Sequence, residues 1–191
     1  METTKIDYKN IYYPPGGILM WILIFLELIT FGVALIVLVV GSRENPELYK
    51  QSANHLNATY GAINTVFLLV SGFFMATSVH QFKLNNIKKS SFYLKLTMLG
   101  GVLFLGLKTL EYSEKIEHGL TLGYDTFFNF YWLLTGFHVI HVLVGLVILL
   151  FMHRSLRKST STLEDVEASA TFWHMCDLIW LLLFPILYLI F

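Results

Sequence analysis

Charged side chains are scarce in this chain. Asp, Glu, Lys and Arg make up 14% of its 191 residues, whereas hydrophobic residues make up 55%. A soluble domain carries about 25% charged residues, so roughly half of the usual solvating surface is missing. A disordered chain would have few apolar residues and many charges, which is the opposite composition. The composition therefore excludes both classes and indicates a membrane protein.

The chain also has a single cysteine and a formal net charge of zero. Cys176 is the only cysteine, which excludes a disulfide framework and any zinc or iron–sulfur site built from several cysteines. Thirteen basic residues balance thirteen acidic ones, so no basic excess is available for binding nucleic acid. The sequence also has no glycine-rich nucleotide loop after a strand and no Gly-x-Ser-x-Gly elbow. We expect no nucleic-acid partner, and no metal site or catalytic centre belonging to this chain.

Long hydrophobic runs are what the chain does have. A helix needs about 20 apolar residues to cross a hydrocarbon core of about 30 Å. Five stretches are long enough: 18–40, 59–79, 92–112, 127–151 and 172–191. Backbone groups in lipid must satisfy one another within a segment, so each stretch is predicted to be a helix. The sequence thus predicts an all-α polytopic membrane protein, with a cytoplasmic tail (1–17) and a five-helix membrane domain (18–191).

Basic residues gather on one side of this predicted bundle. Eight lie in the N-terminal tail and in the loops after the second and fourth spans, whereas three lie on the opposite side. The first group is Lys5, Lys9, Lys83, Lys88, Lys89, Arg154, Arg157 and Lys158; the second is Arg43, Lys50 and Lys115. Because basic residues are retained on the cytoplasmic side, we expect the N terminus in the cytoplasm and the C terminus in the periplasm.

Glu27 lies about ten residues into the first span, near mid-depth. A charge at that depth costs roughly 2.5–3.5 kcal/mol, so the residue requires an explanation. One interpretation is a carboxyl group that handles protons or contacts lipid. The other is a neutral acid that is hydrogen-bonded between helices and fixes their packing. The sequence favours the two interpretations equally.

The fourth span carries a small and polar stripe, Thr135-Gly136-Phe137-His138-x-x-His141-x-x-x-Gly145. Residues three and four apart share a helix face, and glycines let a neighbouring helix approach closely. Gly136 and Gly145 are therefore predicted to be packing positions, as is Gly72 in the second span. We expect His138 and His141 to hydrogen-bond across helices. Metal or haem ligation is the less favoured alternative, because no matching carboxylate or thiolate set accompanies them.

Two pairs of ionisable residues stand three apart within other spans. His174 and Asp177 can face the same groove, where a structural imidazole–carboxylate pair is favoured over a proton relay. Lys108 and Glu111 lie near the outer end of the third span. We expect an ion pair within that helix, with the lysine extended to the outer interface.

The start of the last helix has its own signal. Ser161-x-x-Glu164 has the spacing of a capping box, in which the two side chains bond each other's backbone N–H groups. This predicts that the helix begins near Thr162, well before the chain enters the bilayer.

Taken in order, these motifs resemble the cytochrome c oxidase subunit III family. The run 135–145, followed by Trp173-His174-x-x-Asp177-x-x-Trp180, is similar to the last two helices of that family. Pro14-Pro15-Gly16-Gly17, leading to Trp21 and Glu27, resembles its carboxylate-bearing helix. Leu107-Lys108-x-x-Glu111-Tyr112 resembles its Glu-Tyr motif. The resemblance extends from about Gly16 to the end of the chain and corresponds to the short, five-helix bacterial form.

The resemblance implies a non-catalytic accessory subunit of a haem–copper respiratory terminal oxidase in the bacterial inner membrane. It implies that the chain packs on catalytic subunit I beside other oxidase subunits, holds phospholipid, and supports oxygen access and proton uptake. Haem and copper would lie in the partner subunits. Six residues are implied to be lipid-binding or buried polar positions rather than catalytic ones: Glu27, Glu111, His138, His141, His174 and Asp177.

Three other functions remain as alternatives. Lys108 and the run 184–188 resemble the branch associated with nitric-oxide reductases, which would change the catalytic partner. A membrane cytochrome would use the histidines as axial ligands, but His138 and His141 on one helix cannot clamp both faces of a haem. A proton-coupled carrier would use Glu27 and the His174–Asp177 pair, but the inverted repeat typical of such carriers is missing.

Overall fold

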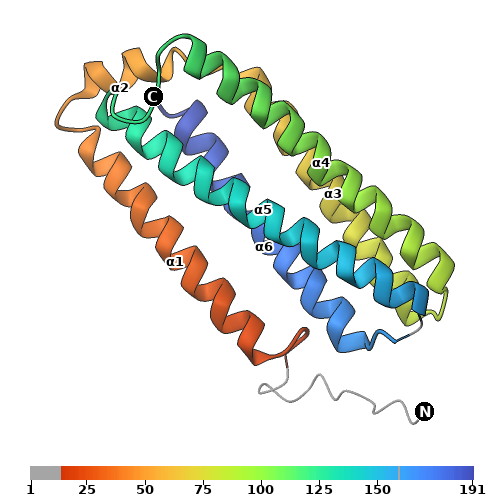
Figure 1. Ribbon diagram of the computed structural model, residues 1–191. Coiled ribbons are helices and arrows are strands. Elements are labelled where there is room, and N and C mark those ends of the chain that lie inside the picture. Colours follow the sequence, from red (N-terminus) through yellow and green to blue (C-terminus); the bar gives the residue numbers. More distant parts are fainter. Residues whose placement is uncertain (1–13, 159) are drawn as a thin grey trace.

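The computed structural model describes residues 14–158 and 160–191, so most of the predicted N-terminal tail, including Lys5 and Lys9, lies outside the described residues. The described part folds into six helices without a strand: α1 (Ile18–Gly41), α2 (Pro46–Ala53), α3 (Ala58–Lys83), α4 (Ile87–Glu117), α5 (Thr126–Lys158) and α6 (Leu163–Tyr188). All except α2 are long and apolar enough to cross a membrane. The predicted all-α fold with five spans is confirmed (Figure 1).

The long helices extend beyond the apolar runs that predicted them. Helix α4 covers 87–117, whereas its apolar run covers 92–112. Helix α6 begins at Leu163, nine residues before its apolar run starts at residue 172. The capping box forms one residue later than predicted, between Thr162 and Asp165, and it starts α6 at the expected place. Apolar content marks only the part of a helix that lies in lipid, whereas caps decide where the helix ends.

The short helix α2 was not predicted. Its eight residues are mostly polar, and Pro46 occupies the first turn, where a proline needs no N–H partner. Tyr49 packs against the rings of Phe127 and Phe191, at centroid distances of 5.9 and 5.6 Å. Helix α2 therefore covers the end of the bundle at which α5 begins and the chain terminates.

The connections separate onto the two ends of the bundle. Figure 1 shows α2, the α4–α5 connection and the C terminus at one end, and the beginning of α1 with the α3–α4 and α5–α6 connections at the other. This alternation is what five antiparallel spans require. The assignment of the second end to the cytoplasm follows from the basic residues alone and stays a prediction.

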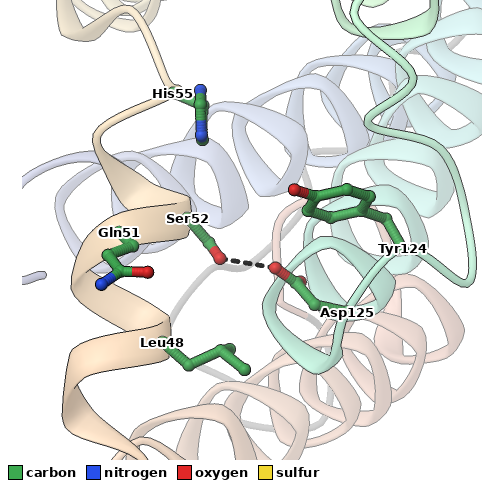
Figure 2. Close-up of a pocket in the computed structure, with 6 residues that line it drawn as sticks. All are labelled: Leu48, Gln51, Ser52, His55, Tyr124 and Asp125. Atoms are coloured by element: carbon green, nitrogen blue, oxygen red, sulfur yellow. Dashed lines mark hydrogen bonds between the residues drawn. The ribbon is translucent and has the colours of Figure 1, made fainter.

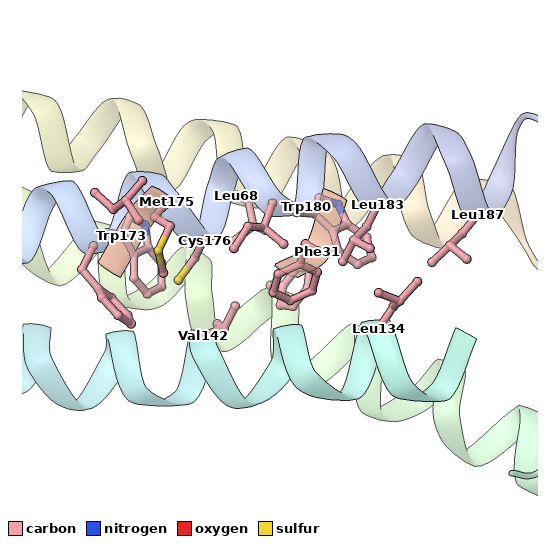
Figure 3. Close-up of a cluster of buried hydrophobic side chains, with 14 of the residues drawn as sticks. Phe31, Leu68, Leu134, Val142, Trp173, Met175, Cys176, Trp180, Leu183 and Leu187 are labelled. Atoms are coloured by element: carbon pink, nitrogen blue, oxygen red, sulfur yellow. The ribbon is translucent and has the colours of Figure 1, made fainter. Parts of the chain in front are cut away.

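Helix α6 lies at the centre of the bundle. It contacts α1, α3 and α5, and Figure 3 shows its side chains filling the space between α3 and α5. Trp173, Cys176, Trp180, Leu183 and Leu187 are all inaccessible to solvent. Helix α1, by contrast, lies at the edge of the bundle against α5 and α6.

Two tryptophans on α6 bind hydroxyl groups on α3. The Trp173 indole N–H donates to Ser71 Oγ at 2.9 Å, and Ser71 in turn donates to the carbonyl of Thr97 on α4 at 3.0 Å. One heptad later, the Trp180 indole N–H donates to Thr65 Oγ1 at 3.0 Å. An indole N–H without a partner would be costly inside a bilayer, so these bonds fix the register of α6 on α3.

Three glycines make room for α6. A Cβ added at Gly101 would lie 2.5 Å from the Trp173 ring, and one at Gly145 would lie 3.0 Å from it. At Gly72 an added Cβ would overlap the Asp177 carboxylate. Gly136 differs, because an added Cβ there meets no described atom within 4 Å. The expectation that Gly136 packs against another helix is wrong within the described residues, because the space that a Cβ would occupy is open.

A glycine turn places the beginning of α1. The Gly17 N–H donates to the carbonyl of Pro14 at 2.9 Å, and Gly16 has a φ of 81°, which a residue with a side chain rarely adopts. A Cβ at Gly16 would lie 2.9 Å from Ala168 Cα. The turn therefore docks directly on α6 and fixes the point from which α1 rises.

We predict that Gly101→Ala destabilises the bundle. The added methyl group would be forced against Trp173, and overpacking of this kind costs about 1–3 kcal/mol. The free energy of unfolding, measured in detergent micelles by titration with a denaturing detergent, should fall by that amount.

Gly106→Ala on the same helix is the matched control, because an added Cβ there meets no described atom within 4 Å. It should not lower the free energy of unfolding. Equal losses of unfolding free energy in the two variants would contradict the conclusion that Gly101 makes room for the Trp173 ring.

Candidate functional site

Glu27 and His141 meet between α1 and α5. Glu27 Oε2 lies 3.4 Å from His141 Nε2, and both side chains are mostly buried. His141 Nδ1 lies 2.8 Å from the carbonyl of Phe137. A carbonyl only accepts hydrogen bonds, so Nδ1 carries a proton. Nε2 is therefore the ring nitrogen that faces Glu27, and Glu27 Oε2 has no hydrogen-bond partner among the described residues.

This arrangement explains why an acid is tolerated at mid-depth. Glu27 Oε2 and His141 Nε2 lie within ion-pair distance, so neither ionisable group lacks a polar neighbour in the span. Phe31 borders the pair, with its ring centroid 5.9 Å from His141 and 5.5 Å from Phe137. His141 therefore contacts a polar residue on another helix, although this contact is not the hydrogen bond that the sequence predicted.

His138 behaves differently, although it lies on the same helix. It is completely buried, yet neither ring nitrogen has a hydrogen-bond partner among the described residues. Its ring stacks on Trp180 at 5.4 Å and meets the edge of Phe104 at 5.6 Å. The expected interhelical hydrogen bond from His138 is therefore wrong, because the facing side chains on α4 and α6 are aromatic rings.

His174 and Asp177 form the predicted contact within α6. His174 Nδ1 lies 3.4 Å from Asp177 Oδ2. Asp177 is buried against Gly72, and its second oxygen has no partner among the described residues. His174 remains partly exposed, so the pair lies at the border of the bundle.

Lys108 and Glu111 form the most deeply buried charged pair. Lys108 Nζ lies 3.0 Å from Glu111 Oε2, and the two side chains are 1% and 0% exposed. Lys108 also donates to the hydroxyls of Tyr131 on α5 and Tyr188 on α6, at 3.2 and 2.8 Å. Both hydroxyls then donate to Glu111 Oε1, at 3.0 and 2.7 Å. Four side chains thus close a ring of hydrogen bonds across three helices.

The expected ion pair is present, but the lysine does not reach the interface. Its ammonium group lies 4.8–5.5 Å from the ring centroids of four aromatic residues: Tyr112, Tyr131, Trp180 and Tyr188. Cation–π contacts and two hydroxyl acceptors replace water. Sequence reasoning missed Tyr131 and Tyr188, because tyrosines near helix ends equally fit an interfacial belt. Asn64 on α3 is also fully buried, and its side-chain amide has no hydrogen-bond partner among the described residues.

A small pocket opens at the end of the bundle that carries α2 (Figure 2). Its volume is about 290 Å³, and its lining includes Gln51, Ser52, His55, Tyr124 and Asp125. Ser52 donates to one Asp125 oxygen, and the other oxygen accepts from the Phe128 N–H at 2.6 Å. Asp125 therefore stabilises the beginning of α5, and both of its oxygens are already engaged.

Tyr49 lies beside this pocket. Its burial, together with the nearby carboxylates of Asp125 and Glu44, raises the pKa of the Tyr49 hydroxyl. Tyr49 therefore stays protonated and serves as a packing residue.

Metal ligation finds no support in the described residues. No group of three or more His, Cys, Asp or Glu side chains within residues 14–158 and 160–191 could hold an ion. Several of the buried ionisable residues instead contact one another or lie among aromatic rings. This defines a polytopic membrane protein with ionisable groups between its helices.

Comparisons with known proteins agree with this class. The model of the family cytochrome c oxidase subunit III matches residues 20–190. Cytochrome c oxidase subunit 3 of Corynebacterium diphtheriae is 31% identical over 147 residues, covering 74% of this chain and 71% of the relative. Cytochrome bo(3) ubiquinol oxidase subunit 3 of Buchnera aphidicola is 29% identical over 174 residues, covering 89% and 91%. The chain belongs to the cytochrome c oxidase subunit III family.

Another relative is longer than this chain. Cytochrome c oxidase subunit 3 of Aedes aegypti is 35% identical over 129 residues, which cover 66% of this chain but only 48% of the relative. This chain therefore matches about half of the length of that relative.

We predict that Glu111→Gln destabilises the bundle strongly. The substitution leaves Lys108 as an unpaired buried cation, and breaking a buried ion pair in this way costs about 3–5 kcal/mol. The free energy of unfolding in detergent should fall accordingly, while Glu117→Gln, on the exposed end of the same helix, should leave it unchanged.

The double variant Lys108→Met/Glu111→Leu should recover most of that loss, because apolar residues of similar volume can replace a buried pair. A double variant as unstable as Glu111→Gln would show that the ion pair itself, and not the uncompensated charge, accounts for the effect.

Proposed function

We propose that this protein is a non-catalytic accessory subunit of a haem–copper respiratory terminal oxidase in the bacterial inner membrane. The observation that carries the proposal is the family match, which runs through all five spans. The ionisable residues within the helices support it, since most of them are committed to contacts between or within helices. Electron transfer to oxygen would take place in partner subunits that hold haem and copper.

The outer face of α1 is the surface that would meet lipid and catalytic subunit I. It is apolar along its whole length and exposed in this chain: Leu19, Ile22, Leu26, Ile29, Val33, Ile36 and Val40 all lie at the surface. Exposed apolar area on this scale marks a contact with a membrane or a protein. Acyl chains held along α1 would lie beside the Glu27–His141 pair and would offer oxygen an apolar route.

The Glu27–His141 pair supports a part in proton uptake. Its members face each other at 3.4 Å, at the edge between α1 and α5. A site of this kind can hold a proton near a partner subunit without carrying out redox chemistry itself. His174 and Asp177 would form a second polar site for proton uptake. This site lies in the half of α6 that is nearer its beginning, at the border of the bundle.

A nitric-oxide reductase is the second candidate for the catalytic partner. One observation favours it: Lys108 and Tyr188, which both belong to motifs that resemble that branch, bond each other at 2.8 Å. The two motifs therefore act as one feature of the structure. The fold and the accessory role would be the same for either partner.

We predict that the chain, purified through an affinity tag from native membranes, brings with it a larger polypeptide that contains haem and copper. The isolated chain should show no haem absorbance. Stoichiometric haem in the isolated chain would establish the cytochrome alternative, whereas substrate-driven pH changes in vesicles that hold this chain alone would establish a carrier. The terminal acceptor that the recovered complex reduces, oxygen or nitric oxide, distinguishes the two candidate partners.

We predict that Glu27→Gln leaves the complex assembled but reduces its phospholipid content or shortens its sustained turnover, because the substitution removes the ionisable carboxyl group beside His141. Glu47→Gln, at an exposed position on α2, is the matched control and should change neither. Unaltered lipid content and turnover in Glu27→Gln would remove the assigned role of this residue.

A further inference from the structure

Cationic side chains converge where α4 begins and α5 ends. Ser91 Oγ on α4 lies 3.1 Å from His153 Nδ1 on α5, so the two helices are joined there. Lys95 follows Ser91 by one turn, and Arg157 follows His153 by one turn. Both are exposed, and both lie near enough to His153 to act on it electrostatically. We call these four residues, which lie along the line where α4 and α5 meet, the α4–α5 basic groove: Ser91, Lys95, His153 and Arg157.

The groove has no acidic neighbour on its own helices. No Asp or Glu occurs in residues 84–110 or in residues 126–163. Within the described residues, no ion pair involves Lys95 or Arg157. Glu167 on α6 does pair with a lysine, but with Lys83 on α3, at 2.8 Å. Further positive charge lies at the same end, on Lys88 and Arg154. Among the described residues, the positive charge of the groove is therefore not neutralised by an ion pair.

Apolar surface continues directly from this charge toward the middle of the bundle. Lys95 lies two turns inside α4, and Leu99 and Val102 follow it on the same helix face and are exposed. Leu143 and Leu150 are exposed on α5. A lysine at this depth keeps its stem on apolar surface and its ammonium group toward the interface. Cationic side chains at the interface thus lie next to exposed apolar side chains deeper in the bilayer. This order matches a phospholipid, which has a charged headgroup and apolar acyl chains.

We propose that the α4–α5 basic groove binds the headgroup of an anionic phospholipid of the phosphatidylglycerol class, whose acyl chains lie along Leu99, Val102, Leu143 and Leu150. The phosphate would accept bonds from Lys95 and Arg157, while His153 is held between them by Ser91. Anionic lipid is favoured over zwitterionic lipid because no described carboxylate lies in the groove to receive a headgroup cation. His141, which faces Glu27, lies on a different face of α5, so this site is separate from the proposed lipid contact along α1.

The test uses the full-length chain in detergent and measures lipid binding by native mass spectrometry. Dioleoylphosphatidylglycerol and dioleoylphosphatidylcholine are titrated separately, and the first should bind more tightly. Lys95→Gln/Arg157→Gln should weaken the binding of phosphatidylglycerol by about five-fold for each charge removed. Arg43→Gln/Lys50→Gln removes the same charge at the opposite end of the bundle and should leave that binding unchanged. Lys95→Arg/Arg157→Lys keeps the charge and should also bind normally, which separates charge from folding.

Several results would overturn the proposal. Equal binding of the two lipids, or equal losses in the two neutralised variants, would show that no specific headgroup site exists. Displacement of phosphatidylglycerol by excess inorganic phosphate would identify a free anion as the ligand. Unchanged phosphatidylglycerol binding in Lys95→Gln/Arg157→Gln, together with loss of a co-purifying large subunit, would assign the groove to a protein partner.

Discussion

The position of α6 is the constraint on which the rest of the structure depends. In a bilayer, hydrophobic burial does not draw apolar helices together, so close packing and hydrogen bonds must do so. Helix α6 supplies both: Trp173 and Trp180 donate to hydroxyls on α3, and glycines on α3, α4 and α5 leave space for its side chains. Helix α1 is then placed by its contacts with α6 and α5. Glu27 meets His141 only because that contact exists.

Residues of one chemical type serve different purposes in this bundle. His141 contacts an acid across helices, His138 is stacked between aromatic rings, and His153 joins two helices among basic side chains. Each use follows from what the neighbouring helix presents at that depth. The polar groups of the spans are therefore best understood through their partners on other helices.

The sequence was sufficient for the architecture and insufficient for several partners. Five spans, the beginning of α6 and the close approach at Gly72 follow from apolar length, capping spacing and small residues, which are local properties. The two tyrosines around Lys108, and the aromatic surroundings of His138, depend on how α4, α5 and α6 are rotated against one another. Gly136 illustrates the same limit, because a glycine in an apolar helix shows that close approach is possible and does not show which face meets a neighbour.

The ring of hydrogen bonds around Lys108 has a consequence for biogenesis. Helix α4 is synthesised before α5 and α6, so Lys108 enters the bilayer with Glu111 as its sole partner from that ring. Tyr131 and Tyr188 reach it only after the two later helices have been inserted. The ion pair within α4 is thus the one part of the ring that can form before the two later helices arrive, and it limits the cost of placing Lys108 in lipid until they do.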